Sequence, residues 1–116
     1  MNEITPAEKR IFTRFEENTN VRYKIIRPVS DPKEYFVVAK DLSIGGLAFV
    51  SYQPIPTNTI LNLKVELLDG LDPIECAANV LRTIKIKEDG EEIYNVSVLF
   101  LDLSSADQAR LTRYTS

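Results

Sequence analysis

The sequence predicts an all-β protein, folded as a barrel or as a sandwich, with helices only at its two ends. Between residues 21 and 101, apolar and polar side chains alternate with a period of two, which is typical of strands that bury one face. Proline, glycine, asparagine and aspartate interrupt this alternation and divide it into six segments joined by short turns. With 116 residues and no internal repeat or linker, the chain is expected to form one modest core.

The first element is expected to be a short helix. Thr5 suits the N-cap, Pro6 suits the first helical position, and Glu8 can complete a capping box. The helix is predicted from about Pro6 toward Glu16, where the polar residues 17–20 end it.

Six segments show strand patterns. In the clearest one, Leu61, Leu63 and Val65 alternate with polar residues, so one face is buried and one is wet. The fifth segment is long and its alternation is imperfect, which predicts a bend or a bulge. The expected strands are residues 21–25, 34–42, 47–52, 61–67, 74–87 and 93–101.

The last turn and the C-terminal helix carry clear local signals. Asp89-Gly90 between the last two strands predicts a hairpin turn, because both residues tolerate positive φ. Ser104 is expected to cap a helix that ends near Arg113. On that helix, Leu111 is expected to close one end of the β-structure.

The composition of the chain limits the classes of partner that it is expected to bind. The chain carries 14 basic and 17 acidic residues, a net charge of -3, which argues against sequence-independent binding to long nucleic acid. The N-terminus shows no signal-peptide pattern, and no apolar run approaches the length that spans a membrane. With a single cysteine, no internal disulfide forms, and we expect a cytoplasmic protein without membrane insertion.

Residue types also restrict the chemistry. The chain has no histidine, which removes serine–histidine and cysteine–histidine catalysis and the commonest metal ligand. Cys76 lies beside Ile74 and Ala77, so we interpret it as a small buried apolar residue. Carboxylates remain as acid–base groups, but no pair stands out. We therefore expect neither an enzyme nor a metal or cofactor.

Arg10 and Arg14 form the first motif of interest. Four residues apart, they would lie on one face of a helix, or bracket a ligand from a loop. The arginine fork fits phosphate oxygens and the O6 and N7 edge of guanine. The alternative is a solvated helix face on which both arginines pair with nearby acids such as Glu16.

Asp41, Ser43 and Gly46 form the second motif, an Asp-x-Ser-x-x-Gly pattern between two apolar runs. Asp41 can accept hydrogen bonds from guanine N1–H and N2–H, and Ser43 can donate or accept. Gly46 is expected to permit positive φ and close approach of a ligand. The alternative is a structural turn, in which Asp41 and Ser43 bond to their own backbone.

Together the two motifs resemble the PilZ domain, a bacterial receptor module for cyclic di-GMP. That family carries Arg-x-x-x-Arg before its first strand and Asp/Asn-x-Ser-x-x-Gly between its second and third. All five positions match here, at Arg10, Arg14, Asp41, Ser43 and Gly46. Two later stretches, residues 79–82 and 96–100, resemble the family's arginine-bearing strand and its final strand.

The resemblance implies a six-stranded antiparallel barrel that binds cyclic di-GMP on its outer surface. Arg10 and Arg14 would grip phosphates and the Hoogsteen edges of guanine, Asp41 and Ser43 would contact guanine, and Gly46 would keep the turn open. Residues 1–20 would form an N-terminal arm, mobile without ligand, that folds over it beside the barrel of residues 21–116. This movement would signal to a protein effector, from a monomer or a small homo-oligomer.

Two other binding functions compete with this one. A PilZ-like interaction module without nucleotide binding is disfavoured, because a degenerate copy would be expected to have lost an arginine. An unrelated small β-barrel that binds oligonucleotides is disfavoured by the acidic balance of the chain.

Overall fold

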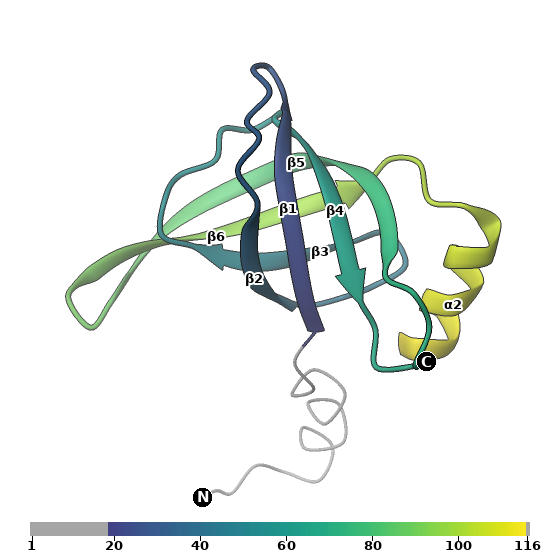
Figure 1. The fold of residues 1–116 in the computed structure, drawn as a ribbon. Helices are drawn as coiled ribbons and strands as arrows, with labels where there is room; N and C mark the ends of the chain where they lie inside the picture. Colours follow the sequence, from purple (N-terminus) through teal and green to yellow (C-terminus); the bar gives the residue numbers. More distant parts are fainter. Residues whose placement is uncertain (1–18, 116) are drawn as a thin grey trace, which may run out of the picture.

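The computed structural model describes residues 19–115 and shows six antiparallel strands that close into a barrel (Figure 1). The strand order is β1-β2-β3-β6-β5-β4, and β4 pairs back to β1. The elements are β1 Thr19–Arg27, β2 Tyr35–Lys40, β3 Gly46–Ser51, β4 Ile60–Glu66, β5 Ile74–Glu88, β6 Glu91–Phe100 and helix α2 Ser105–Thr115. The all-β prediction is confirmed, and the barrel rather than the sandwich is the architecture.

Inward-facing residues from all six strands fill the barrel. Phe49 is fully buried and its ring lies 5.1 Å from that of Tyr23, which stacks on Tyr35 at 4.9 Å. Each such side chain contributes about 1.5–3 kcal/mol when it leaves water. Other core residues are Val21, Ala39, Leu61, Leu63, Val65, Ile74, Val80, Val96 and Val98.

All six predicted strands are present, with ends that differ from the prediction by up to two residues, and two of these differences shape the region around Asp41. β1 begins at Thr19, earlier than expected, because Thr19 already pairs with Ala39 on β2. β2 ends at Lys40 and not at residue 42, since Asp41 adopts a φ of 53° and turns the chain out of the strand. Leu42 then turns back into the core, where it is buried.

The predicted irregularity of β5 is confirmed as a bulge. Val80 lies opposite Val98, but the next pair joins Arg82 to Ser97, which leaves Leu81 as the extra residue. In an unbroken ladder Arg82 would lie opposite Val96, whose side chain is fully buried. The bulge therefore moves Arg82 to the outer face of the barrel.

The β5–β6 hairpin projects beyond the barrel (Figure 1). Its turn has Asp89 at a φ of 53° and Gly90 at 82°, between the paired residues Glu88 and Glu91. Positive φ at both central residues is the conformation expected for the Asp-Gly pair, so this prediction is confirmed.

Helix α2 covers one end of the barrel. The Ser104 hydroxyl accepts a hydrogen bond from the N–H of Asp107 at 3.1 Å, which confirms the predicted cap. Leu111 is 1% exposed and packs into the core. Arg110 donates to both carboxylate oxygens of Asp69 at 3.0–3.2 Å, which ties the helix to the loop after β4.

The helix predicted over residues 6–16 lies outside the described residues. Within the part that the structure describes, no helix is long and apolar enough to cross a membrane.

Replacing Arg110 with methionine should raise the pKa of Asp69 toward its ordinary value of 3.8. In the native protein partial desolvation raises this pKa, but hydrogen bonds from the N–H of Leu71 and from Arg110 outweigh it and lower the pKa overall. Such a group stabilises the fold above its unfolded pKa, and that contribution is lost as pH falls through the folded pKa. A carboxyl NMR titration of Asp69 measures the shift directly.

The matched control is Lys87→Met on the projecting hairpin, which should leave the Asp69 pKa unchanged. The stability difference between native protein and R110M, measured by urea unfolding, should shrink as pH falls below about 4. An unchanged Asp69 pKa in R110M would show that the ion pair does not form in solution.

Candidate functional site

The turn from Asp41 to Gly46 connects β2 to β3 at the end of the barrel where β1 begins. Thr19 pairs with Ala39, so the chain enters the barrel two residues from Asp41 along the neighbouring strand. The first residue of β1 therefore lies beside this turn.

The Ser43 hydroxyl organises the turn. It accepts hydrogen bonds from the N–H groups of Gly45 and Gly46 at 3.2 and 3.3 Å, and donates to the carbonyl of Gly46 at 3.3 Å. The backbone N–H of Ser43 donates to the same carbonyl at 2.9 Å. A hydroxyl can donate one hydrogen bond and accept two, so the bonds within the turn occupy every hydrogen-bonding position of the Ser43 hydroxyl.

The turn is also fixed to the barrel wall. The carbonyl of Gly45 accepts a hydrogen bond from the N–H of Phe100 at 2.9 Å, where β6 ends. Leu42 anchors the other side by its burial in the core. These two attachments hold the exposed residues Asp41 and Ile44 on a rigid support.

Asp41 is exposed, as Ser43 is, but its carboxylate makes no hydrogen bond or ion pair within residues 19–115. The structural-turn interpretation is thus confirmed for Ser43 but not for Asp41. Aspartate tolerates positive φ better than most residues. The same residue therefore ends β2 and presents an acceptor to solvent.

Gly46 has a structural role that the sequence did not reveal. The prediction of positive φ at Gly46 is wrong, because positive φ among the described glycines occurs only at Gly70 and Gly90. A Cβ at Gly46 would instead lie 2.0 Å from the carbonyl oxygen of Val98 on β6. Glycine is required here because two backbones approach closely.

A row of outward-facing residues crosses the barrel wall next to the turn. The pairs Lys40–Ala48, Ala48–Ser97 and Ser97–Arg82 join four neighbouring strands. Directly paired residues share a face, so the exposed Lys40 and Arg82 flank the half-buried Ser97 and the buried Ala48 over about 14 Å. This platform suits a flat, anionic molecule.

The single cysteine, Cys76, is buried. Burial, followed by the nearby charges of Asp102, Asp107 and Glu75, raises the pKa of Cys76 to about 12, so its thiol stays neutral. This confirms Cys76 as a small buried residue. Across residues 19–115, no three acidic or cysteine side chains are grouped as a metal site requires.

The arginine motif, Arg10 and Arg14, lies outside the described residues, so the structure does not bring the two motifs together or separate them. Sequence reasoning missed Lys40 and Ser97, because their alignment depends on register between strands. Arg82 was noted as part of a family stretch, but its outward position depends on the bulge.

A family model for the PilZ domain matches residues 8–116. The chain belongs to the PilZ domain family. The match includes Arg10 and Arg14 together with the whole barrel and α2. A search of curated proteins gave no match.

Solved structures show the same fold. MrkH of K. pneumonia in its apo state superposes with a TM-score of 0.70 at 25% identity, over 86% of this chain and 46% of MrkH. The PilZ domain of Escherichia coli YcgR, solved with c-di-GMP, superposes with a TM-score of 0.61 at 17% identity, over 84% of this chain and 78% of the YcgR chain. The Bacillus subtilis inhibitor of motility MotI/DgrA superposes with a TM-score of 0.63 at 18% identity, over 86% of this chain and 49% of MotI/DgrA. The chain thus spans about half the length of MrkH and of MotI.

The two glycines of the turn provide a matched pair of variants. Gly46→Ala should lower the free energy of unfolding by about 1–3 kcal/mol, because the new methyl group collides with the Val98 carbonyl. Gly45→Ala should change stability little, since its nearest neighbour would be the Ser43 hydroxyl at 4.0 Å. Urea unfolding of both variants measures the difference. Equal stabilities would contradict the close approach of β3 and β6 at Gly46.

Proposed function

We propose that this PilZ domain is a non-enzymatic receptor for cyclic di-GMP that transmits binding to a protein partner. The main support is the turn that presents the Asp41 carboxylate, which has no partner among residues 19–115, beside the start of β1. The fold relatives add support, because YcgR was solved with c-di-GMP and MrkH is described as a c-di-GMP-dependent transcription regulatory factor.

Asp41 suits guanine. A carboxylate can accept both N1–H and N2–H, a pattern that adenine cannot match. The donors in this pair come from the ligand, so Asp41 needs no proton of its own. Ser43 acts chiefly by shaping the turn, because a hydrogen bond from its hydroxyl to guanine would have to replace one of the bonds that it makes within the turn.

The cationic residues suit the phosphates. Lys40 and Arg82 lie on the outer face in one row across the barrel, next to the turn. Arg14 precedes Thr19 by five residues, which span at most about 18 Å when extended, so its guanidinium can reach the same face. Arg10 and Arg14 would add forked contacts to phosphates and to guanine edges.

The proposed signal is a change of surface. Ligand held between the turn and the arginines would order the segment before β1 against the barrel. A partner that recognises this combined surface would then sense the nucleotide. No additional cofactor is needed for this mechanism.

Calorimetric titration with cyclic di-GMP tests the proposal. The native chain should bind with micromolar affinity, about -8 kcal/mol. Arg10→Ala, Arg14→Ala and Asp41→Ala should each weaken binding about tenfold or more, the equivalent of one good polar contact.

Arg27→Ala is the matched control, because Arg27 is exposed at the opposite end of β1 and should leave affinity unchanged. Circular dichroism should show the same barrel in all variants. Absence of heat at high micromolar ligand, or full affinity in the Arg10 and Arg14 variants, would overturn the proposal.

A further inference from the structure

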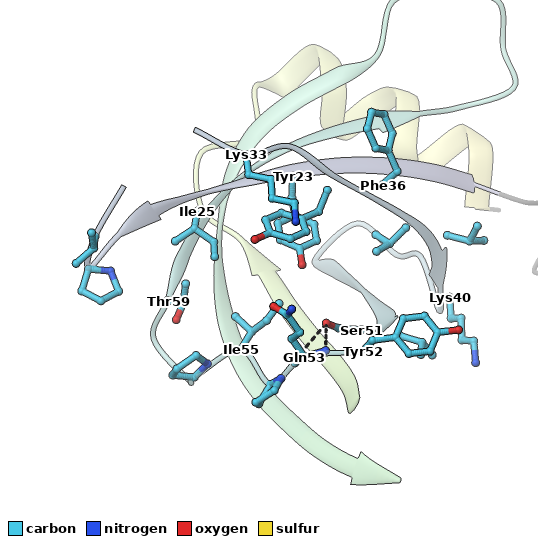
Figure 2. Close-up of a pocket in the computed structure, with 18 residues that line it drawn as sticks. Tyr23, Ile25, Lys33, Phe36, Lys40, Ser51, Tyr52, Gln53, Ile55 and Thr59 are labelled. Carbon is cyan, nitrogen blue, oxygen red and sulfur yellow. Dashed lines mark hydrogen bonds between the residues drawn. The ribbon is translucent and has the colours of Figure 1, made fainter. Parts of the chain in front are cut away.

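A groove opens in the barrel wall between β2 and β3. These strands pair only at Ala39–Phe49 and Lys40–Ala48, so residues 35–38 of β2 have no β3 partner. The cavity there has a volume of about 810 Å³, within the 300–1,000 Å³ typical of ligand sites. Figure 2 shows side chains from β1, β2 and the segment after β3 around it.

The floor of the groove is apolar and uncharged. Tyr23 lies at its centre, stacked on Tyr35, with Ile25 and Ile55 beside them (Figure 2). Burial raises the pKa of the Tyr23 hydroxyl to about 12, so it stays protonated at neutral pH. Apolar side chains that enter the groove would therefore be well accommodated.

The rim exposes large apolar side chains. Val29, Phe36 and Tyr52 are 75%, 73% and 76% exposed, and all three line the groove. Exposed apolar groups gathered around one concave surface are typical of a surface that binds another molecule.

The β2 edge of the groove offers free backbone groups. A strand directs alternate N–H and C=O groups to each of its two neighbours. β1 covers one edge of residues 35–38, through pairs such as Val21–Val37. Within residues 19–115, no strand pairs with the other edge of residues 35–38, and no backbone hydrogen bond from a turn or loop reaches their N–H or C=O groups.

The charge of the groove is opposite to that of the chain. Among residues 19–115, Lys33 and Lys40 are the charged residues that line the groove, whereas the whole chain carries a net charge of -3. The Lys33 ammonium lies 4.9 Å above the Tyr35 ring. The Asp31 carboxylate lies nearby and accepts hydrogen bonds from the N–H of Lys33 and the Tyr35 hydroxyl at 3.0 and 3.2 Å. Because both donors are neutral, Asp31 offsets part of the positive charge at the Lys33 end, whereas no acidic residue lines the described groove at the Lys40 end. This complementarity favours an anionic occupant.

We propose that the groove binds an extended peptide segment of a partner protein, added as a strand to the free edge of β2. Its apolar side chains would pack on the tyrosine floor and on the rim, and acidic residues at its two ends would pair with Lys33 and Lys40. These lysines are seven positions apart in sequence, but Lys33 precedes β2 and its ammonium lies over the Tyr35 ring, so the acids should be about five to seven residues apart, roughly 17–24 Å along a strand.

A strand explains more of the groove than other occupants do. A fatty acid would use the floor and one lysine but would leave the backbone of residues 35–38 unpaired. A second copy of this chain could offer its own free β2 edge, but antiparallel pairing of the two edges would bring the lysines of both grooves together, and like charges repel. The proposal does not depend on cyclic di-GMP.

The test uses the full chain and a fluorescein-labelled probe peptide, acetyl-Glu-Val-Thr-Val-Tyr-Val-Thr-Glu-amide. Fluorescence anisotropy should show saturable binding, and a peptide with lysine in place of both glutamates should bind at least about tenfold more weakly. Two further peptides carry N-methyl groups on odd or on even residues. At least one should lose binding, because a strand uses alternate N–H groups toward each neighbour.

Variants of the protein locate the site. Lys33→Glu should weaken binding of the acidic probe about tenfold, whereas the matched charge reversal Lys87→Glu on the hairpin should not. Hydrogen exchange should slow at residues 35–38 when the probe binds. Affinity for cyclic di-GMP measured on the same samples is a separate readout, so failure of one proposal is distinguishable from failure of the other.

Several outcomes would overturn the proposal. They are no saturable binding of the acidic probe, full binding of both N-methylated peptides, or binding without protection at residues 35–38. Saturable binding of sodium laurate but of no peptide would identify a fatty-acid site instead. A monomer–dimer equilibrium shifted by Lys33→Glu, without peptide binding, would identify the second copy as the occupant.

Discussion

The candidate site depends on the close approach of two backbones, Gly46 on β3 and Val98 on β6. No Cβ fits between them, so β3 can begin only at a glycine in this position. The hydrogen bonds of Ser43 then fold the preceding residues into a fixed turn, and Asp41 takes the left-handed conformation that starts it. The backbone of Asp41 is therefore fixed to the barrel, which reduces the backbone entropy that would be lost when a ligand binds its exposed carboxylate.

Much of this fold could be predicted from the sequence, because the determining signals are local. The alternation of Leu61, Leu63 and Val65 and the Asp89-Gly90 turn each specify their element through neighbouring residues. The role of Gly46 could not be predicted, since it depends on Val98, a residue far away in the sequence. The outer row of Lys40, Ser97 and Arg82 was missed for the same reason, because one bulged residue decides which side chains share a face.

β2 links the two proposed binding surfaces. Its C-terminal end leads into the turn at Asp41, and its free edge forms one wall of the groove. Lys40 belongs to both, as the last residue of the strand and as a lining residue of the groove. If both proposals hold, nucleotide at the turn and peptide on the edge would compete for this lysine or share it, which would couple the two affinities.

The most direct test of the central claim is a two-dimensional amide NMR titration of the native chain with cyclic di-GMP. The account predicts saturable shifts at residues 40–46 and at Arg82 and Ser97, together with new protection in the segment that carries Arg10 and Arg14. Residues 52–56 of the groove should change little. An absence of shifts, or shifts confined to the groove, would contradict the assignment of the turn as the nucleotide site.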